Sequence, residues 1–235
     1  MKKPKHIGIA AITAEGGALA YREIVHASEL ILGRDRHPEI SLHSHSFSDY
    51  TESKENKNEV WSNLIIESSR KLAIAGAEFF ICPANTNHLV FDLVQDRIAI
   101  PWLHIASMVS QQAQASGLKK SLLLGTKPLI QSEIYSKYFR ANEIELVVPS
   151  DKDQDLVDRI IYEELIRGII SPATKASIVE MIKEYRCANI IDSVILGCTE
   201  LPLLINNSDV EVCLLDSTRI LARGAVVMAT SLQDL

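Results

Sequence analysis

Short apolar runs alternate along the whole chain with longer segments in which apolar residues recur every three to four positions. The short runs predict strands, and the periodic segments predict amphipathic helices. Helices are expected at 58–76 and 153–168, each closed by a glycine, and at 217–232. Strands are expected at 6–12, 40–46, 77–83, 100–106, 119–126, 144–150, 188–197 and 210–216.

This alternation of strands and helices indicates parallel βαβ units, with helices on both faces of the sheet. We therefore expect an α/β protein. In such sheets ligands bind beyond the carboxyl ends of the strands. The segments to search for chemistry follow the apolar runs, at 13–17, 44–49, 83–88, 125–128, 197–200 and 216–218.

Composition and charge narrow the class of protein. The chain has 235 residues and 47% hydrophobic content, enough for one large domain or two packed halves. A net charge of −6 argues against nucleic-acid binding. No apolar run approaches the roughly 18 residues of a membrane span, and the start lacks the apolar core of a secretory signal. Four cysteines without a CxxC pair predict reduced thiols and no metal, in a cytoplasmic protein.

The loop after the run at 188–197 is one candidate for chemistry. Gly197 permits a tight turn, and Cys198 follows at the start of an expected helix. A thiol at a helix N-terminus meets exposed N–H groups and the positive end of the dipole, which both favour thiolate. The position predicts either a reactive Cys198, alkylated faster than Cys187 or Cys213, or a small buried hydrophobic side chain.

The segment "PANTNH" at 83–88 is a second candidate with the same order of strand, turn, polar cluster and apolar segment. When the two loops are aligned by strand end, Ala84 stands opposite Cys198. The two positions lie about half the chain apart. This similarity between two distant loops suggests that the chain has two similar halves.

Together, "PANTNH" and "GCTELP" resemble the paired signature of the aspartate/glutamate racemase superfamily, with Cys-Asn-Thr-x-His in one half and Gly-Cys-Thr-Glu in the other. "IPWLHIA", "LLLGTKPLIQSEIY", "IIYEELIRGII" and "LLDSTRILARGAV" also match, in the family's order, over nearly the whole chain. The resemblance implies two similar α/β halves, each a mostly parallel sheet flanked by helices, with the active site in the cleft between them. It also implies a homodimer. We expect the first half at 1–103 plus 208–235 and the second at 104–207.

The resemblance implies a cofactor-independent enzyme without pyridoxal phosphate. One thiolate removes the Cα proton of an amino acid, and a thiol on the other face returns one. Donors at the substrate carboxylate must stabilise the carbanion-like state between these steps. By resemblance, Cys198 is one acid/base residue. The residues that match carboxylate-binding positions are Asn85, Thr86 and Thr199.

His88 and Glu200 match family positions beside the two acid/base residues. By resemblance they orient or tune those groups. The structural alternative for both is helix capping and packing.

Ala84 departs from the family pattern because it occupies the first cysteine's position. A methyl group cannot transfer a proton, so the two-thiol exchange cannot run. The chain is an engineered knockout, or a natural variant in which Cys198 works with His88 or a water, or an enzyme that needs one donor. Arylmalonate decarboxylases of this superfamily keep only the second cysteine. Cys82 is a poor substitute because it lies within the expected strand, behind Pro83.

The substrate side chain is less well specified. The first loop lacks the Gly-Gly-Met-Gly-Pro-Glu-type segment of many relatives, which leaves Thr13 as a candidate carboxylate contact. No arginine follows the second strand, where some aspartate racemases carry one. Arg167 is the remaining candidate cation, and its alternative is a solvent-facing helix end.

Three functions stay open on these residues. The first is an amino-acid racemase for aspartate or glutamate with its partner position disabled. The second is a one-cysteine decarboxylase or isomerase of small dicarboxylates. The third is an inactive homologue that binds an amino acid.

Overall fold

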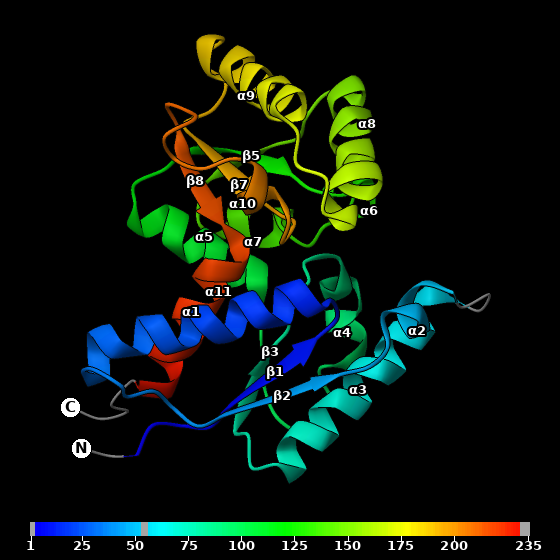
Figure 1. Ribbon diagram of the computed structural model, residues 1–235, viewed down its shortest axis with the longest axis vertical. Coiled ribbons are helices and arrows are strands. Elements are labelled where there is room, and N and C mark those ends of the chain that lie inside the picture. The colour runs from blue at the N-terminus through cyan, green and yellow to red at the C-terminus, as the bar shows by residue number, and fades with distance from the viewer. Residues whose placement is uncertain (1–2, 53–55, 231–235) are drawn as a thin grey trace. The chain divides into compact units, whose positions relative to one another are not determined.

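The computed structural model describes residues 3–52 and 56–230, which form two compact units. The first unit takes the residues up to Ile105 and from Thr218 onward, and the second takes Ala106–Ser217. Each unit is built around its own parallel four-stranded sheet (Figure 1). The expected α/β class, with two halves that each hold a parallel sheet flanked by helices, is therefore confirmed.

The sheet of the first unit has the order β2-β1-β3-β4, and all neighbouring strands are parallel. The central strand β1 is buried along its whole length, as its Ile-Gly-Ile-Ala-Ala sequence predicts for a strand covered on both faces. The strands are β1 (Ile7–Ala11), β2 (Ile40–Ser44), β3 (Phe79–Ile81) and β4 (Trp102–Leu103). The helical elements are α1 (Ala14–Leu32), α2 (Phe47–Thr51), α3 (Lys57–Ile74), η1 (Thr86–Val90), α4 (Phe91–Val94) and α11 (Ser217–Thr230).

The sheet of the second unit has the order β6-β5-β7-β8, again all parallel. The two central strands are apolar and buried: all four residues of β7, and all but the first residue of β5. The strands are β5 (Lys120–Leu124), β6 (Glu145–Val147), β7 (Ser193–Leu196) and β8 (Cys213–Asp216). The helical elements are α5 (Ile105–Ala115), α6 (Lys127–Ile130), α7 (Ser136–Ala141), α8 (Asp151–Arg159), η2 (Ile160–Glu164), η3 (Leu165–Arg167), α9 (Pro172–Cys187) and α10 (Leu201–Leu204).

Each unit has its own hydrophobic core. In the first unit Ile65 and Leu72 of α3 belong to the same buried cluster as Phe80 of β3. In the second, Leu122 of β5 and Ile178 of α9 share a larger cluster. Burying one such side chain completely contributes about 1.5–3 kcal/mol, so the sheets hold the loops at their carboxyl ends on a rigid base.

Two elements differ from the pattern expected along the chain. The run at 100–106 gives only the two-residue strand β4, because α5 begins at Ile105. The segment 153–168 is not one α-helix: α8 is followed by a π-helical turn, η2, and a 3-10 turn, η3. It ends, as expected, at a glycine, and Gly168 has a φ of 73°. The last two residues of the helix expected at 217–232 lie outside the described residues.

The segment 208–217 lies in the second unit. It contains β8, which pairs with β7 from Ser193–Cys213 to Leu196–Asp216. The expectation from the sequence had attached this segment to the first half. The chain returns to the first unit only with α11.

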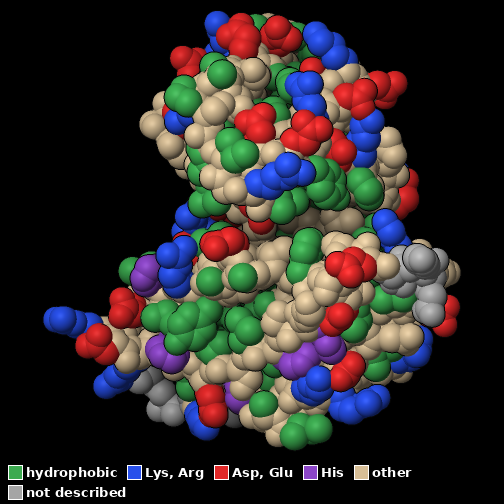
Figure 2. Space-filling view, turned by 45° about the vertical axis from the view of Figure 1, so that its right-hand side comes forward, with side chains coloured by type: hydrophobic (Ala, Val, Ile, Leu, Met, Phe, Trp, Pro, Cys, Tyr) green, Lys and Arg blue, Asp and Glu red, His purple; other side chains and the backbone are tan. Residues whose placement is uncertain are grey.

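The described surface and helices can be compared with the charge and hydropathy of the sequence. On the face shown in Figure 2, acidic and basic side chains are interspersed. None of the helices in the described ranges is both long and apolar enough to cross a bilayer.

Candidate active site

The loop after β3 carries the first group of expected site residues. Asn85 is 3% exposed, while Ala84 and Thr86 are partly exposed. A short 3-10 helix, η1, begins at Thr86 and places His88 on its first turn. The backbone N–H of His88 donates to the Asn85 carbonyl at 3.0 Å, which closes the turn. Ala84 and the expected carboxylate-binding residues therefore follow the carboxyl end of a buried strand, as anticipated.

His88 is fixed by two backbone groups. Its Nδ1 lies 3.1 Å from the carbonyl oxygen of Ala84, which can only accept, so Nδ1 carries the proton. Its Nε2 accepts the backbone N–H of Ile105, the first residue of α5, at 3.2 Å. The ring also contacts Trp102, with centroids 4.6 Å apart. His88 is thus a neutral donor–acceptor link between the loop and Ile105, the last residue of this part of the first unit.

Burial lowers the pKa of His88 well below its ordinary value of 6.5, and the neighbouring His104 adds to this. Protonation would also break the bond from Ile105. These constraints argue against His88 as the proton carrier that Ala84 lacks. Its position supports the alternative of a structural role in the loop.

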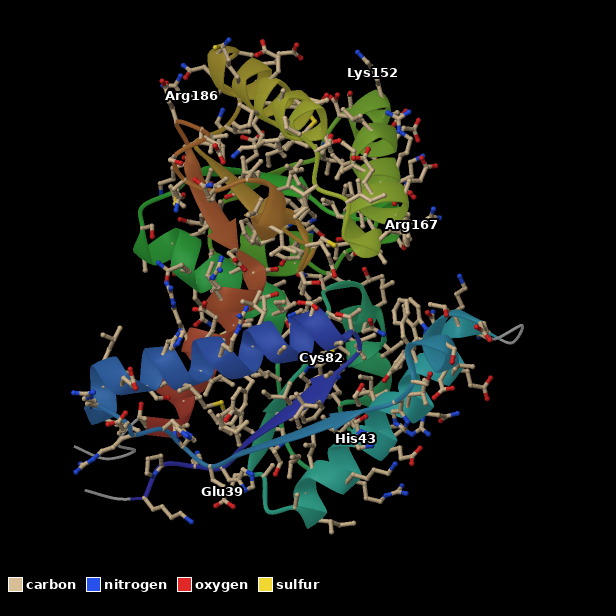
Figure 3. All side chains as sticks on the ribbon, viewed as in Figure 1. Glu39, His43, Cys82, Lys152, Arg167 and Arg186 are labelled. Carbon is tan, nitrogen blue, oxygen red and sulfur yellow. The ribbon has the colours of Figure 1, made fainter. Side chains whose placement is uncertain are left out.

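Cys82 does not replace the missing thiol either. It is fully buried in the core of the first unit, inside the fold in Figure 3. Its Sγ faces the Ala84 carbonyl at 4.0 Å. Burial raises the pKa of Cys82 to about 12, so it stays a protonated thiol at neutral pH.

The loop after β7 carries the second group, and Gly197 sets its path. The Gly197 N–H donates to the Leu124 carbonyl of β5 at 2.7 Å. A Cβ at Gly197 would lie 2.8 Å from that carbonyl oxygen and 2.8 Å from Leu129 Cδ2. Only glycine allows this approach, because any other residue would place its Cβ too close to these two atoms.

Cys198, Thr199 and Glu200 form one hydrogen-bonded cluster. The Cys198 thiol donates to Glu200 Oε2 at 2.9 Å, and the Thr199 hydroxyl donates to the same oxygen at 2.7 Å. Glu200 is 7% exposed, while Cys198 and Thr199 are partly exposed. A single buried carboxylate oxygen therefore holds both neighbouring protons.

The cluster argues against activation of Cys198 by a helix dipole. The following helix, α10, has only four residues, and Glu200 precedes it. Burial raises the pKa of Cys198 well above its ordinary value of 9.0, and the negative charge of Glu200 raises it further. Backbone N–H groups of Thr199 and Glu200 oppose this shift with a smaller effect. The raised pKa favours the protonated thiol at neutral pH, and Cys187 is the more exposed of the two. Faster alkylation of Cys198 than of Cys187 stays a prediction.

Tyr162 is a neighbour of this cluster that the sequence did not indicate. Burial raises the pKa of Tyr162, and the charges of Asp158 and of ionised Cys198 raise it as well. Tyr162 sits on the π-helical turn η2. Helical periodicity cannot reveal such a turn, because the extra residue changes which side chains share a face.

The two remaining candidates for carboxylate binding lie on other elements. Thr13 is the N-cap of α1, and its hydroxyl accepts the Gly16 N–H at 3.2 Å. Arg167 is exposed at the end of η3 and extends outward in Figure 3. Within the described residues, no three His, Cys, Asp or Glu side chains are grouped to hold a metal ion.

Comparison with known proteins gives a consistent result for this arrangement. A family model described as Asp/Glu/hydantoin racemase matches residues 9–225. The broad specificity amino-acid racemase RacX of Bacillus subtilis is 30% identical over 169 residues, which cover 69% of each chain.

Solved structures show the same fold. The crystal structure of an aspartate racemase homologue from Pyrococcus horikoshii is 36% identical, with a TM-score of 0.85, and the match covers 98% of this chain and 100% of the other. The aspartate racemase of Picrophilus torridus is 23% identical, with a TM-score of 0.75 over 96% and 94% of the chains. At that identity the second likeness concerns the fold alone.

Proposed function

The chain belongs to the Asp/Glu/hydantoin racemase family, and on that premise we propose that it is an amino-acid isomerase that uses no cofactor and acts on aspartate or glutamate. RacX, a relative named for broad amino-acid specificity, supports an amino-acid substrate, and the family's description supports aspartate or glutamate. Cys198 is the proposed acid/base residue. Ala84 marks the position of a partner that this chain lacks.

The observation that carries this proposal is the bond from the Cys198 thiol to Glu200 Oε2 at 2.9 Å. For the thiol to act as a base, its proton must first leave, and Glu200 is placed to accept it. The thiolate then takes the Cα proton of the substrate, and the electron pair left behind is delocalised into the carboxylate. In the reverse direction the thiol returns its proton to Cα.

Binding of the substrate carboxylate is the proposed role of Asn85, Thr86 and Thr199, with Thr13 and Arg167 as further contacts. These residues would stabilise the negative charge that moves onto the carboxylate when Cα is deprotonated. The Thr199 hydroxyl now donates to Glu200, so it would have to rotate to donate to a substrate. His88 supports the loop, and Glu200 tunes the thiol.

The proposal predicts one-sided proton transfer. In D2O, one enantiomer of aspartate or glutamate should exchange its Cα proton, and racemisation should be at least about 100-fold slower than exchange, since opposite-face transfer has no group at position 84. Ala84→Cys should raise racemisation in both directions by about 100-fold or more. Exchange is measured by NMR, and racemisation by chiral chromatography.

Two variants control this experiment. Ala84→Ser adds a hydroxyl group in place of the thiol of Ala84→Cys. Serine is similar in size to cysteine but gives up its proton much less readily, so this variant should not restore racemisation. Cys198→Ala in the Ala84→Cys background should remove the gain. A folded Ala84→Cys protein that exchanges one enantiomer but racemises neither would contradict the missing-partner proposal.

A second candidate is a decarboxylase or isomerase of small dicarboxylates that uses one cysteine. The raised pKa of Cys198 favours it, because a thiol that stays protonated can deliver its proton to a carbanion from one face. Release of CO2 from substituted malonates, lost in Cys198→Ala, would support this candidate over racemisation. Binding of amino acids without exchange or CO2 release would indicate an inactive homologue. We also propose a homodimer, which sedimentation analysis tests.

A further inference from the structure

The second unit contains a hollow between the C-terminal half of α9 and the loop that precedes β8. Because α9 leads into β7, this hollow lies at the amino ends of β7 and β8. The loop with Cys198 follows the carboxyl end of β7, so the hollow and this loop lie at opposite ends of the strands of the same sheet. The proposed reaction makes no use of the hollow.

The inner wall of the hollow is apolar. Val179 and Ile182 come from α9, and Val210 comes from the loop. Ile182 is 1% exposed and belongs to the core of the unit, so this wall is rigid. The hollow is partly open to solvent and has a volume of about 170 Å³. A protein cavity of about 150 Å³ accepts a molecule the size of benzene, so a branched side chain of about four carbon atoms fits.

The rim carries both signs of charge. Lys183 and Arg186 lie on the α9 side, and Asp209 and Glu211 lie on the loop side. Arg186 Nη2 is 2.6 Å from Glu211 Oε2, across the rim, and Figure 3 shows Arg186 at the end of α9. Among residues 3–52 and 56–230, Lys183 is paired with exposed Glu180 alone, at 3.5 Å, so its ammonium can accept another anion.

Both acids of the rim already have cationic partners. Asp209 is paired with Lys175 at 2.7 Å, and this bond lowers the pKa of its carboxyl group. A plain carboxylate that binds Arg186 would draw this cation from Glu211 and leave the Glu211 carboxylate without its partner. A plain amine that binds Glu211 would leave Arg186 without its partner in the same way. A molecule with both charges avoids both conflicts.

We propose that the hollow binds a small zwitterion with a branched apolar side chain, of which an aliphatic amino acid is the simplest example. The side chain contacts Val179, Ile182 and Val210. The carboxylate faces Lys183 and Arg186, and the ammonium faces the acids of the loop. This site is separate from the proposed reaction site and does not depend on it.

Cys187 gives a direct measurement because it lines the hollow and is exposed. Alkylation of each cysteine is followed by mass spectrometry with L-leucine, with 4-methylpentanoate, which lacks the ammonium, and with 3-methylbutylamine, which lacks the carboxylate. At about ten times its dissociation constant, leucine should slow Cys187 alkylation about tenfold. Each analogue should protect at least about tenfold less well at equal concentration. Absence of protection, or equal protection by all three compounds, would overturn the proposal.

Variants link the protection to the hollow. Val210→Trp fills the hollow and should abolish protection of Cys187. Lys183→Glu, at an exposed position that tolerates charge, should also abolish protection. It provides the test if Val210→Trp does not fold. Lys152→Ala, on the exposed face of α8 in the same unit, is the control and should leave protection unchanged.

The same experiment separates this site from the proposed reaction site. If leucine protects Cys198 from alkylation but does not protect Cys187, the inference is wrong and the proposed function is unaffected. Protection of Cys187 in a protein that exchanges no amino-acid proton would support the inference while the proposed function fails.

Discussion

At the scale of single residues, the proton positions around the two loops are set by acceptors. His88 is neutral because one ring nitrogen faces a carbonyl and the other faces an N–H. Cys198 is a thiol because its nearest partner is a carboxylate. The sequence identified both residues by resemblance, but it could not supply their protonation, which depends on contacts with groups such as Ile105 that lie elsewhere in the chain.

Glu200→Gln tests the control of the Cys198 proton. Removing the negative charge removes one cause of the raised pKa, so the pH at which Cys198 alkylates half-maximally should fall. If the Glu200 charge contributes one unit to the pKa of Cys198, alkylation of Cys198 at a pH below that pKa should be about tenfold faster in Glu200→Gln than in the wild-type protein. Rates are measured with iodoacetamide between pH 7 and 10. Glu180→Gln, at an exposed position on α9, is the control, and an unchanged profile in Glu200→Gln would refute the role of Glu200.

His88→Gln tests the buried neutral imidazole through stability. The unfolded chain takes up a proton on His88 near pH 6.5, while the folded chain resists it until the pH is well below that value. The contribution to stability is therefore present above pH 6.5 and is lost as the pH falls, by up to about 1.4 kcal/mol per pH unit. His88→Gln should flatten the fall in unfolding free energy between pH 6.5 and 5, measured by urea denaturation.

The same substitution at exposed His26 of α1 is the matched control and should keep the slope of the wild-type protein. A wild-type slope in His88→Gln would mean that another group takes up the proton. The absolute stability of the variant is a separate quantity, because Gln can replace only part of the packing against Trp102.

At the scale of elements, the paths of the loops follow from close backbone approaches. Gly197 lets the end of β7 meet the Leu124 carbonyl, and this contact aims the chain toward Cys198. Every expected strand exists. Continuous apolar runs predicted the buried strands β1, β3, β5 and β7, and alternation of apolar and polar residues predicted the more exposed strand β2. The π-helical turn η2 and the short β4 escaped prediction, because both depend on tertiary contacts and leave the local apolar pattern unchanged.

Gly197→Ala should be costly for this reason. The added methyl would force apart β5 and β7 or displace Leu129, at a cost of about 1–3 kcal/mol in unfolding free energy. Gly117→Asn is the comparison, because position 117 has open space and a φ of 71° that asparagine tolerates. Its cost should stay below about 1 kcal/mol. Equal costs for the two variants, by urea denaturation, would show that the contact at 197 relaxes freely.

At the scale of the whole molecule, the two parallel sheets could be predicted from the pattern of strands and helices and from the echo between two loops. The position of β8 could not. Its sequence fits either sheet, and only its pairing with β7 assigns it to the second unit. The residues that bring the chain back to the first unit are those of α11, whose buried positions recur at 221, 222, 225, 226 and 229.

Because α11 belongs to the first unit but is synthesised after the second, the order of synthesis on the ribosome affects how the protein folds. The end of α11 bonds to the start of the chain, where the Lys5 N–H donates to the Ala229 carbonyl at 2.9 Å, and Arg219 pairs with Glu23 at 3.0 Å. Translation at about 5–20 residues per second needs roughly 6–22 s to make the stretch between the two parts of the first unit. Throughout that interval the first-made sheet lacks its last helix, and by its end all four strands of the second sheet have been synthesised. The unit begun first is therefore the one finished last.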